Sequence, residues 1–83
     1  MVSNMSKIVV GKEELEDRAR SAVRGTVGNY DVQTVTIKLL EERDAIGRNW
    51  TIASIEPPIL NQDASFRAYQ AGCGLADKFD LAE

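Results

Sequence analysis

Among the residue types that commonly do chemistry, this chain has one cysteine, Cys73, and thirteen carboxylates. It has no histidine. Histidine is the commonest general base and metal ligand, so its absence excludes Ser-His-Asp, Cys-His and His-metal arrangements within one chain. One cysteine without histidine also gives too few soft ligands for a structural zinc ion, and it allows no intrachain disulfide. We therefore expect a protein that is not an enzyme and has no catalytic residues, metal or cofactor.

Cys73 lies between two glycines, in the segment Ala-Gly-Cys-Gly-Leu. A reactive thiol needs a lowered pKa, and the nearest cations in the sequence, Arg67 and Lys78, are six and five residues away. We interpret Cys73 as a small apolar residue of the core. The catalytic alternative is a pocket formed between subunits by carboxylates and Cys73.

Carboxylates cluster at 13–17 and at 41–44. The first cluster falls at the start of a predicted helix, where acidic side chains complement the positive end of the helix dipole. The second cluster lacks the alternating oxygen ligands of a calcium-binding loop. Neither cluster predicts a catalytic or metal site.

Arg43 and Arg48 flank a predicted loop, and Trp50 follows it. Two arginines beside an aromatic ring are a candidate site for an anion or for single-stranded nucleic acid. The chain as a whole has 10 Lys and Arg against 13 Asp and Glu, a net charge of −3. This acidic balance, without a basic run, argues against general nucleic-acid binding. A nucleic-acid-binding regulator using Arg43, Arg48 and the arginines of the first helix, Arg20 and Arg24 among them, is the alternative function.

The hydrophobic pattern predicts four elements in 83 residues. Apolar residues at helical spacing predict a helix over 12–27, and β-branched runs predict strands over 32–41 and 49–55. The loop between the strands is too short for a parallel crossover, so they should form an antiparallel hairpin. A second helix is expected over about 62–78, capped by Asn61 or Asp63 and softened by Gly72 and Gly74. The predicted fold class is α+β, in the order helix, strand, strand, helix, with the hairpin packed against both helices.

The second predicted helix carries two apolar stripes. One consists of Phe66, Tyr69, Cys73 and Ala76, and the adjoining one of Ala68, Gly72, Leu75 and Phe79.

The register of the hairpin decides which apolar residues face the helices. If Leu39 lies opposite Trp50, the inner residues are Val35, Ile37, Leu39, Trp50 and Ile52, and the outer ones are Leu40, Ala53 and Ile55. If Leu40 lies opposite Trp50, the inner residues are Val35, Ile37, Leu39, Ala53 and Ile55, and the outer ones are Leu40, Trp50 and Ile52. Neither register gives a polar outer face.

An apolar outer face and two free strand edges need cover. A second copy is the expected cover, with strand edges pairing across a two-fold axis to form a larger sheet. The predicted interface residues are Leu40, Trp50, Ile52 and Ile55. The competing interpretation is that Ile8, Val9 and Val10 form a third strand, with or without dimerisation.

The length predicts a single domain over 1–83, with 1–7 and 80–83 poorly ordered. No stretch approaches the roughly 18 apolar residues of a membrane span, and the apolar run 8–10 is too short for the core of a signal peptide. We therefore expect a cytoplasmic, non-catalytic protein-interaction module that forms a homodimer or binds another protein.

Overall fold

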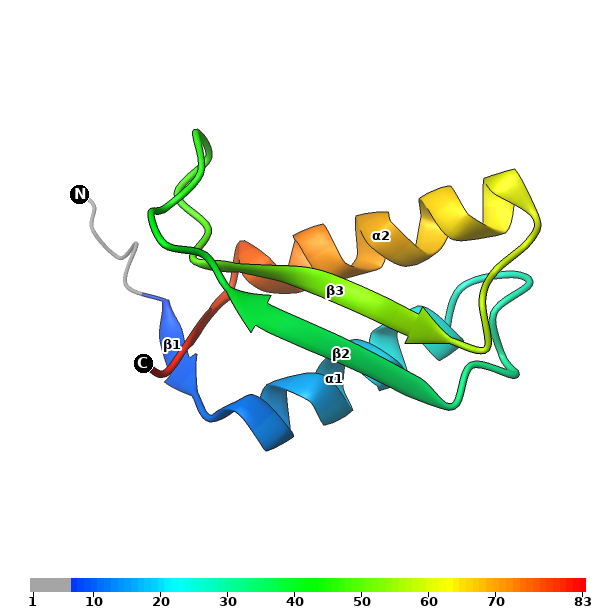
Figure 1. The fold of residues 1–83 in the computed structure, drawn as a ribbon, viewed down its shortest axis with the longest axis horizontal. Helices are drawn as coiled ribbons and strands as arrows, with labels where there is room; N and C mark the ends of the chain where they lie inside the picture. The colour runs from blue at the N-terminus through cyan, green and yellow to red at the C-terminus, as the bar shows by residue number, and fades with distance from the viewer. Residues whose placement is uncertain (1–6) are drawn as a thin grey trace.

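The computed structural model describes residues 7–83, which form a small α+β domain (Figure 1). In chain order the elements are β1 (Ile8–Val10), α1 (Lys12–Arg24), β2 (Thr34–Leu39), β3 (Trp50–Glu56), α2 (Gln62–Ala76) and β4 (Phe79–Leu81). The predicted arrangement of two helices and an antiparallel hairpin is confirmed. Both helices lie behind the hairpin, with α1 against β2 and α2 against β3 (Figure 1).

The hairpin has the first of the two predicted registers, with Leu39 opposite Trp50. A bulge interrupts this register, because Ile37 pairs with Ile52 and Thr36 with Ser54, which leaves Ala53 unpaired. The bulge shifts the alternation of β3, so that both Ile52 and Ile55 turn to the helices.

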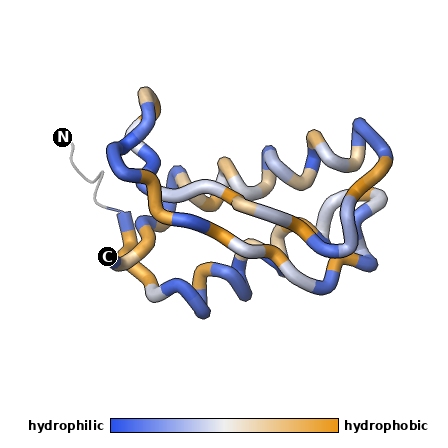
Figure 2. The backbone as a smooth tube through the Cα atoms, viewed as in Figure 1, coloured by the Kyte–Doolittle hydropathy of each residue, from blue (hydrophilic) through white to orange (hydrophobic). Residues whose placement is uncertain are grey.

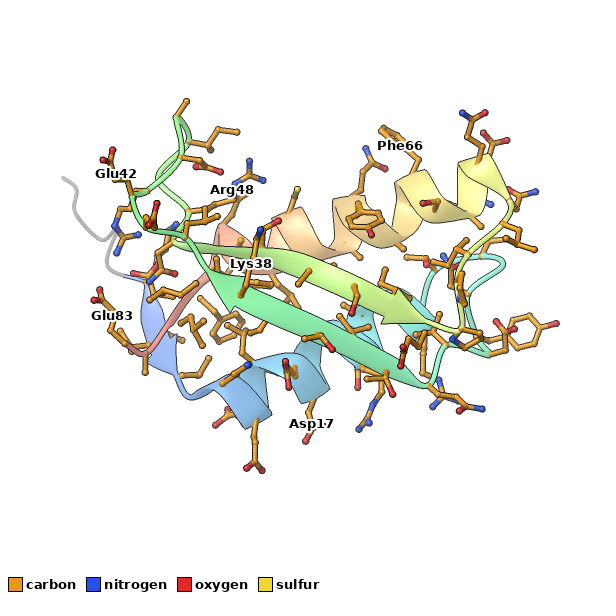
Figure 3. All side chains as sticks on the ribbon, in the orientation of Figure 1. Asp17, Lys38, Glu42, Arg48, Phe66 and Glu83 are labelled. Atoms are coloured by element: carbon orange, nitrogen blue, oxygen red, sulfur yellow. The ribbon has the colours of Figure 1, made fainter. Side chains whose placement is uncertain are left out.

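The outer face of the hairpin is consequently polar, contrary to our prediction. It presents exposed residues such as Lys38, Thr51 and Ser54. The apolar side chains of both strands are buried except Ala53 and Leu39, and Leu39 was predicted to be an inner residue. Figure 2 shows hydrophilic and hydrophobic residues alternating along β2, and Lys38 lies on the side away from the helices (Figure 3). The prediction failed because a one-residue bulge cannot be read from the apolar pattern alone.

Helix α1 begins after Gly11 and buries Leu15, Ala19 and Val23, which recur every four residues and therefore share one face. It ends at Arg24, three residues before the predicted end. The carboxylate of Glu16 accepts a hydrogen bond from the backbone N–H of Ile37 in β2, at 3.0 Å. This contact links α1 to the edge of β2 that does not pair with β3.

The terminal strands β1 and β4 pair in parallel, with Val9 opposite Asp80. The run 8–10 is thus a strand, as the competing interpretation had it, but it does not join the hairpin. The chain end also differs from the prediction, because Phe79–Leu81 is ordered as β4. Lys7 is described as well, and its ammonium group donates to the carbonyls of Gly47 and Ala76. The rest of the N-terminal segment predicted to be poorly ordered, 1–6, lies outside the described residues.

Polar side chains hold the β1–β4 pair, which we call the terminal ribbon, against the hairpin. The buried amide of Asn49 pairs with the backbone of Leu81, donating to its carbonyl and accepting from its N–H, each at 3.0 Å. The indole N–H of Trp50 donates to the carbonyl of Phe79 at 3.0 Å. These bonds satisfy backbone groups of β4 that its short pairing with β1 leaves over.

Candidate functional site

Helix α2 turns its smallest residues toward the core. Ala64, Ala68, Gly72 and Ala76 recur every four residues and are all buried. At Gly72 the approach is closest, because a Cβ atom there would lie 2.5 Å from Cδ1 of Ile52. The bulky side chains of the hairpin fill the space that the small residues of α2 leave open.

The bulky residues of α2 point the other way. Phe66 and Tyr69 are 64% and 43% exposed, and Cys73 is exposed as well. Their spacings of three and four residues place them on one stripe, which we call the α2 outer face. Figure 3 shows Phe66 pointing away from the body of the molecule. Of the predicted stripe, Phe66, Tyr69 and Cys73 are therefore at the surface, but its fourth member, Ala76, is buried. Ala68 and Gly72 of the adjoining stripe form the core contact.

A hollow of about 80 Å³, which we call the Cys73 pocket, lies beside the α2 outer face. It opens between α2 and the start of β3, and its lining residues are Asp44, Arg48, Trp50, Thr51, Ile52, Tyr69, Gly72, Cys73 and Ala76. Most of the wall is apolar, and the charged groups come from the loop that joins β2 to β3.

A network in that loop fixes Arg48 at the pocket. Nε of Arg48 donates to Oδ2 of Asp44 at 2.8 Å, and Oδ1 of Asp44 accepts from the backbone N–H groups of Arg48 and Ile46. The backbone hydrogen bond from Arg48 is the main cause that lowers the pKa of Asp44, and the hydrogen bond to Asp44 is the main cause that raises the pKa of Arg48. The Arg48 side chain is thus both held in place and largely neutralised.

The placement of Cys73 corrects our interpretation of it as a core residue. It is exposed, because the neighbouring Gly72 rather than Cys73 meets β3. Arg48 lines the same pocket, although 25 positions separate the two residues in the sequence. No spacing argument along the chain could have found this pair, because the hairpin brings it together.

Three of the four predicted interface residues lie in the core of the single chain. Trp50, Ile52 and Ile55 are buried against the helices, and Leu40 is half-buried at the end of the hairpin. Trp50 is only 1% exposed and belongs to the apolar cluster that joins the hairpin to both helices. These side chains are therefore not the apolar outer surface on which the interface prediction rested.

The two predicted anion-binding arginines are each paired with a carboxylate of this chain. Arg43 makes two hydrogen bonds to Asp80, at 2.8 and 3.0 Å, and Arg48 is bound to Asp44. The bond from Arg43 is also the main cause that lowers the pKa of Asp80. This geometry leaves the loop arginines little charge for an anion.

The arginines of α1 are also engaged. Arg20 pairs with Asp17 at 2.9 Å, and Nε of Arg24 donates to the carbonyl of Tyr30. Of these two residues, Arg20 is thus paired with a carboxylate, whereas Arg24 keeps its positive charge because a carbonyl is neutral.

Over residues 7–83 no group of three or more His, Cys, Asp or Glu side chains could hold a metal ion. Within the same range no helix has the length and apolar character to cross a membrane. Comparisons with models of protein families, with curated proteins and with solved structures gave no match. The α2 outer face and the Cys73 pocket together form the candidate functional site.

Proposed function

We propose that this chain is a non-catalytic protein-interaction module that forms a homodimer through the α2 outer face. The observation that carries the proposal is which residues α2 buries. Its alanines and a glycine face the core, whereas the aromatic residues Phe66 and Tyr69 are exposed to solvent. Exposed aromatic rings in such a stripe are typical of interfaces, where they supply much of the binding energy.

The apolar area available to a dimer is adequate. The exposed parts of Phe66 and Tyr69 offer roughly 200 Å² per copy. Ile46 in the loop between β2 and β3 is 67% exposed, and Leu60, just before α2, is 94% exposed. Together these two add roughly 150 Å². Figure 1 shows that this loop rises beyond the C-terminal end of α2, on the side away from α1.

An interface is only a little more than half apolar. Roughly 350 Å² of apolar surface therefore corresponds to about 600 Å² per copy, or about 1,200 Å² in total. That total is at the lower end of specific protein interfaces. A second copy of this chain is thus a sufficient partner.

The strand edges are less suited to the larger sheet that the sequence suggested. Glu16 already occupies the N–H of Ile37 on the β2 edge, and the bulge at Ala53 interrupts β3. A side-chain acceptor and a bulge both hinder pairing with another strand. We therefore place the contact on α2, with the two hairpins remaining separate.

A cytoplasmic location is part of the proposal. The chain has one cysteine, and its thiol is exposed, which suits a reducing compartment better than an oxidising one.

The mass in solution tests the proposal, measured by sedimentation over a range of micromolar concentrations. We expect the wild-type mass to rise from that of one chain to that of two. Phe66→Ser should lower the dimer affinity at least tenfold, because it removes the more exposed of the two rings of the interface. It should leave the unfolding free energy of the monomer within about 0.5 kcal/mol, since the side chain is exposed.

Tyr30→Ser is the matched control, because Tyr30 is a 75% exposed ring in the segment between α1 and β2. It should leave the dimer unchanged. A wild-type protein that stays at the mass of one chain would contradict the proposal. So would a salt-sensitive shift of single-stranded nucleic acid by the monomer, which would favour the nucleic-acid alternative.

A further inference from the structure

Side-chain size changes along α2. Its N-terminal half carries the bulky rings of Phe66 and Tyr69, whereas its C-terminal half has the small sequence 72–74, Gly-Cys-Gly. The Cys73 pocket lies beside this small segment. Each molecule thus presents both a projecting ring and a hollow on the same side of the same helix.

A two-fold axis that sets two copies of α2 antiparallel would match these features. With the axis between positions 69 and 70, position 66 of one copy faces position 73 of the other. A bulky side chain then meets a small one twice, once on each side of the axis, as in knobs-into-holes packing. A parallel arrangement would instead place the two Phe66 rings opposite each other and leave both pockets open.

The chemistry of the pocket suits an aromatic ring. Ile52 and Tyr69 provide apolar wall, and Arg48 adds a guanidinium that Asp44 holds in place. The planar guanidinium can stack on the face of a ring even though Asp44 offsets its charge. The hollow measures about 80 Å³, about half the roughly 150 Å³ of a cavity that takes a whole benzene molecule. It therefore has room for the outer part of a phenyl ring.

We infer that the homodimer is antiparallel along α2 and that Phe66 of the partner subunit completes the Cys73 pocket of each copy. This inference rests on the proposed function and specifies its partner and its contact. The pocket is a half-site in the single chain, and its occupant is a side chain of the second copy. No small ligand is needed to explain it.

An exchange of ring and hollow tests the inference. Phe66→Ala removes the ring and should weaken the dimer at least tenfold. Cys73→Phe blocks the pocket and should also weaken the dimer at least tenfold, although it adds apolar surface. The double variant Phe66→Ala/Cys73→Phe restores one ring and one hollow at each contact, and it should recover most of the affinity. Cys73→Ala is the control, because it keeps the pocket and should change affinity less than threefold.

All four variants change exposed positions of α2, and urea unfolding at low protein concentration verifies that each one folds. If the wild-type protein never dimerises, the proposed function fails. If it dimerises and the double variant is no stronger than the single variants, the pairing of positions 66 and 73 is overturned while the dimer stands.

The rate at which a thiol reagent labels Cys73 gives a second measurement. In the wild-type protein the rate should fall as the concentration rises, because the second copy covers Cys73. In Phe66→Ala it should stay at the monomer rate over the same range. Equal rates for a wild-type dimer and its monomer would overturn the inference.

Discussion

The hairpin and α2 distribute side-chain size in opposite ways. The hairpin turns Trp50, Ile52 and Ile55 inward and presents a polar outer face. Helix α2 turns alanines and Gly72 inward and presents Phe66 and Tyr69 to solvent. The two elements fit because the large inner residues of one occupy the space left by the small inner residues of the other.

This difference teaches that apolarity alone does not decide which face of an element is buried. Both stripes of α2 are apolar, and the stripe with smaller side chains faces the core because it lets the helix approach the hairpin closely. The stripe with the larger side chains is then left exposed to solvent. Substitutions that alter size on each face test this explanation.

The largest effect is expected from the inner face of the hairpin. Trp50→Ala should lower the free energy of unfolding by about 3–5 kcal/mol, because it opens a large cavity and removes the donor to the carbonyl of Phe79. Lys38→Ala, on the outer face, should change it by less than about 0.5 kcal/mol. Urea unfolding of both variants measures the difference. Similar losses for the two would mean that Trp50 is not a core residue.

A smaller loss is expected where α2 meets β3. Gly72→Ala should destabilise the fold by about 1–2 kcal/mol, because the new methyl group would lie 2.5 Å from Cδ1 of Ile52. Ile52→Val removes that terminal carbon, so the double variant should be more stable than the sum of the two single losses predicts. Additive losses in this double-mutant cycle would show that size at this contact does not limit the approach of α2.

Much of the fold could be predicted from the sequence, since periodicity located both helices and both hairpin strands. The prediction of the fold failed where a single residue changed the geometry. Ala53 forms a bulge that no pattern signals, and it moved Ile55 from the outer face to the core. The strand β4 was missed because three residues carry too little pattern, and its order depends on the distant side chains of Asn49 and Trp50.

The candidate site was less predictable. The apolar character of Phe66, Tyr69 and Cys73 was evident, but the sequence did not say which of two neighbouring stripes is buried. The position of Arg48 at the Cys73 pocket depends on the hairpin, and its pairing with Asp44 was not apparent from composition. The two loop arginines, whose charge looked free in the sequence, are therefore each paired with a carboxylate in the fold.

A gain in stability is expected on the outer side of α2. Nothing lies within 4 Å of a Cβ atom placed on Gly74, in contrast to Gly72 two residues earlier. Gly74→Ala should therefore stabilise the monomer by about 0.5–1 kcal/mol, because alanine loses less backbone entropy in a helix. Urea unfolding at a concentration below dimer formation measures this change. A loss as large as that of Gly72→Ala would remove the distinction between the two faces.

The smallest change in stability is expected from pH. The contact between the hairpin and α2 is apolar and should be insensitive to acid. The pair of Arg43 and Asp80 at the terminal ribbon is different, since the pKa of Asp80 is lowered in the folded chain. A lowered pKa gives stability above the unfolded value of about 3.9, and this stability is lost as the pH falls toward the folded value. In urea unfolding, the free energy of unfolding of Asp80→Asn should thus be lower than that of wild type at about pH 7. This difference should narrow as the pH falls toward about 3. Asp17→Asn removes a carboxylate that is 70% exposed, whereas that of Asp80 is only 14% exposed, so it should lower the free energy of unfolding less at every pH. A difference in the free energy of unfolding that stays constant with pH would mean that the β1–β4 pair is held by its backbone and amide contacts alone.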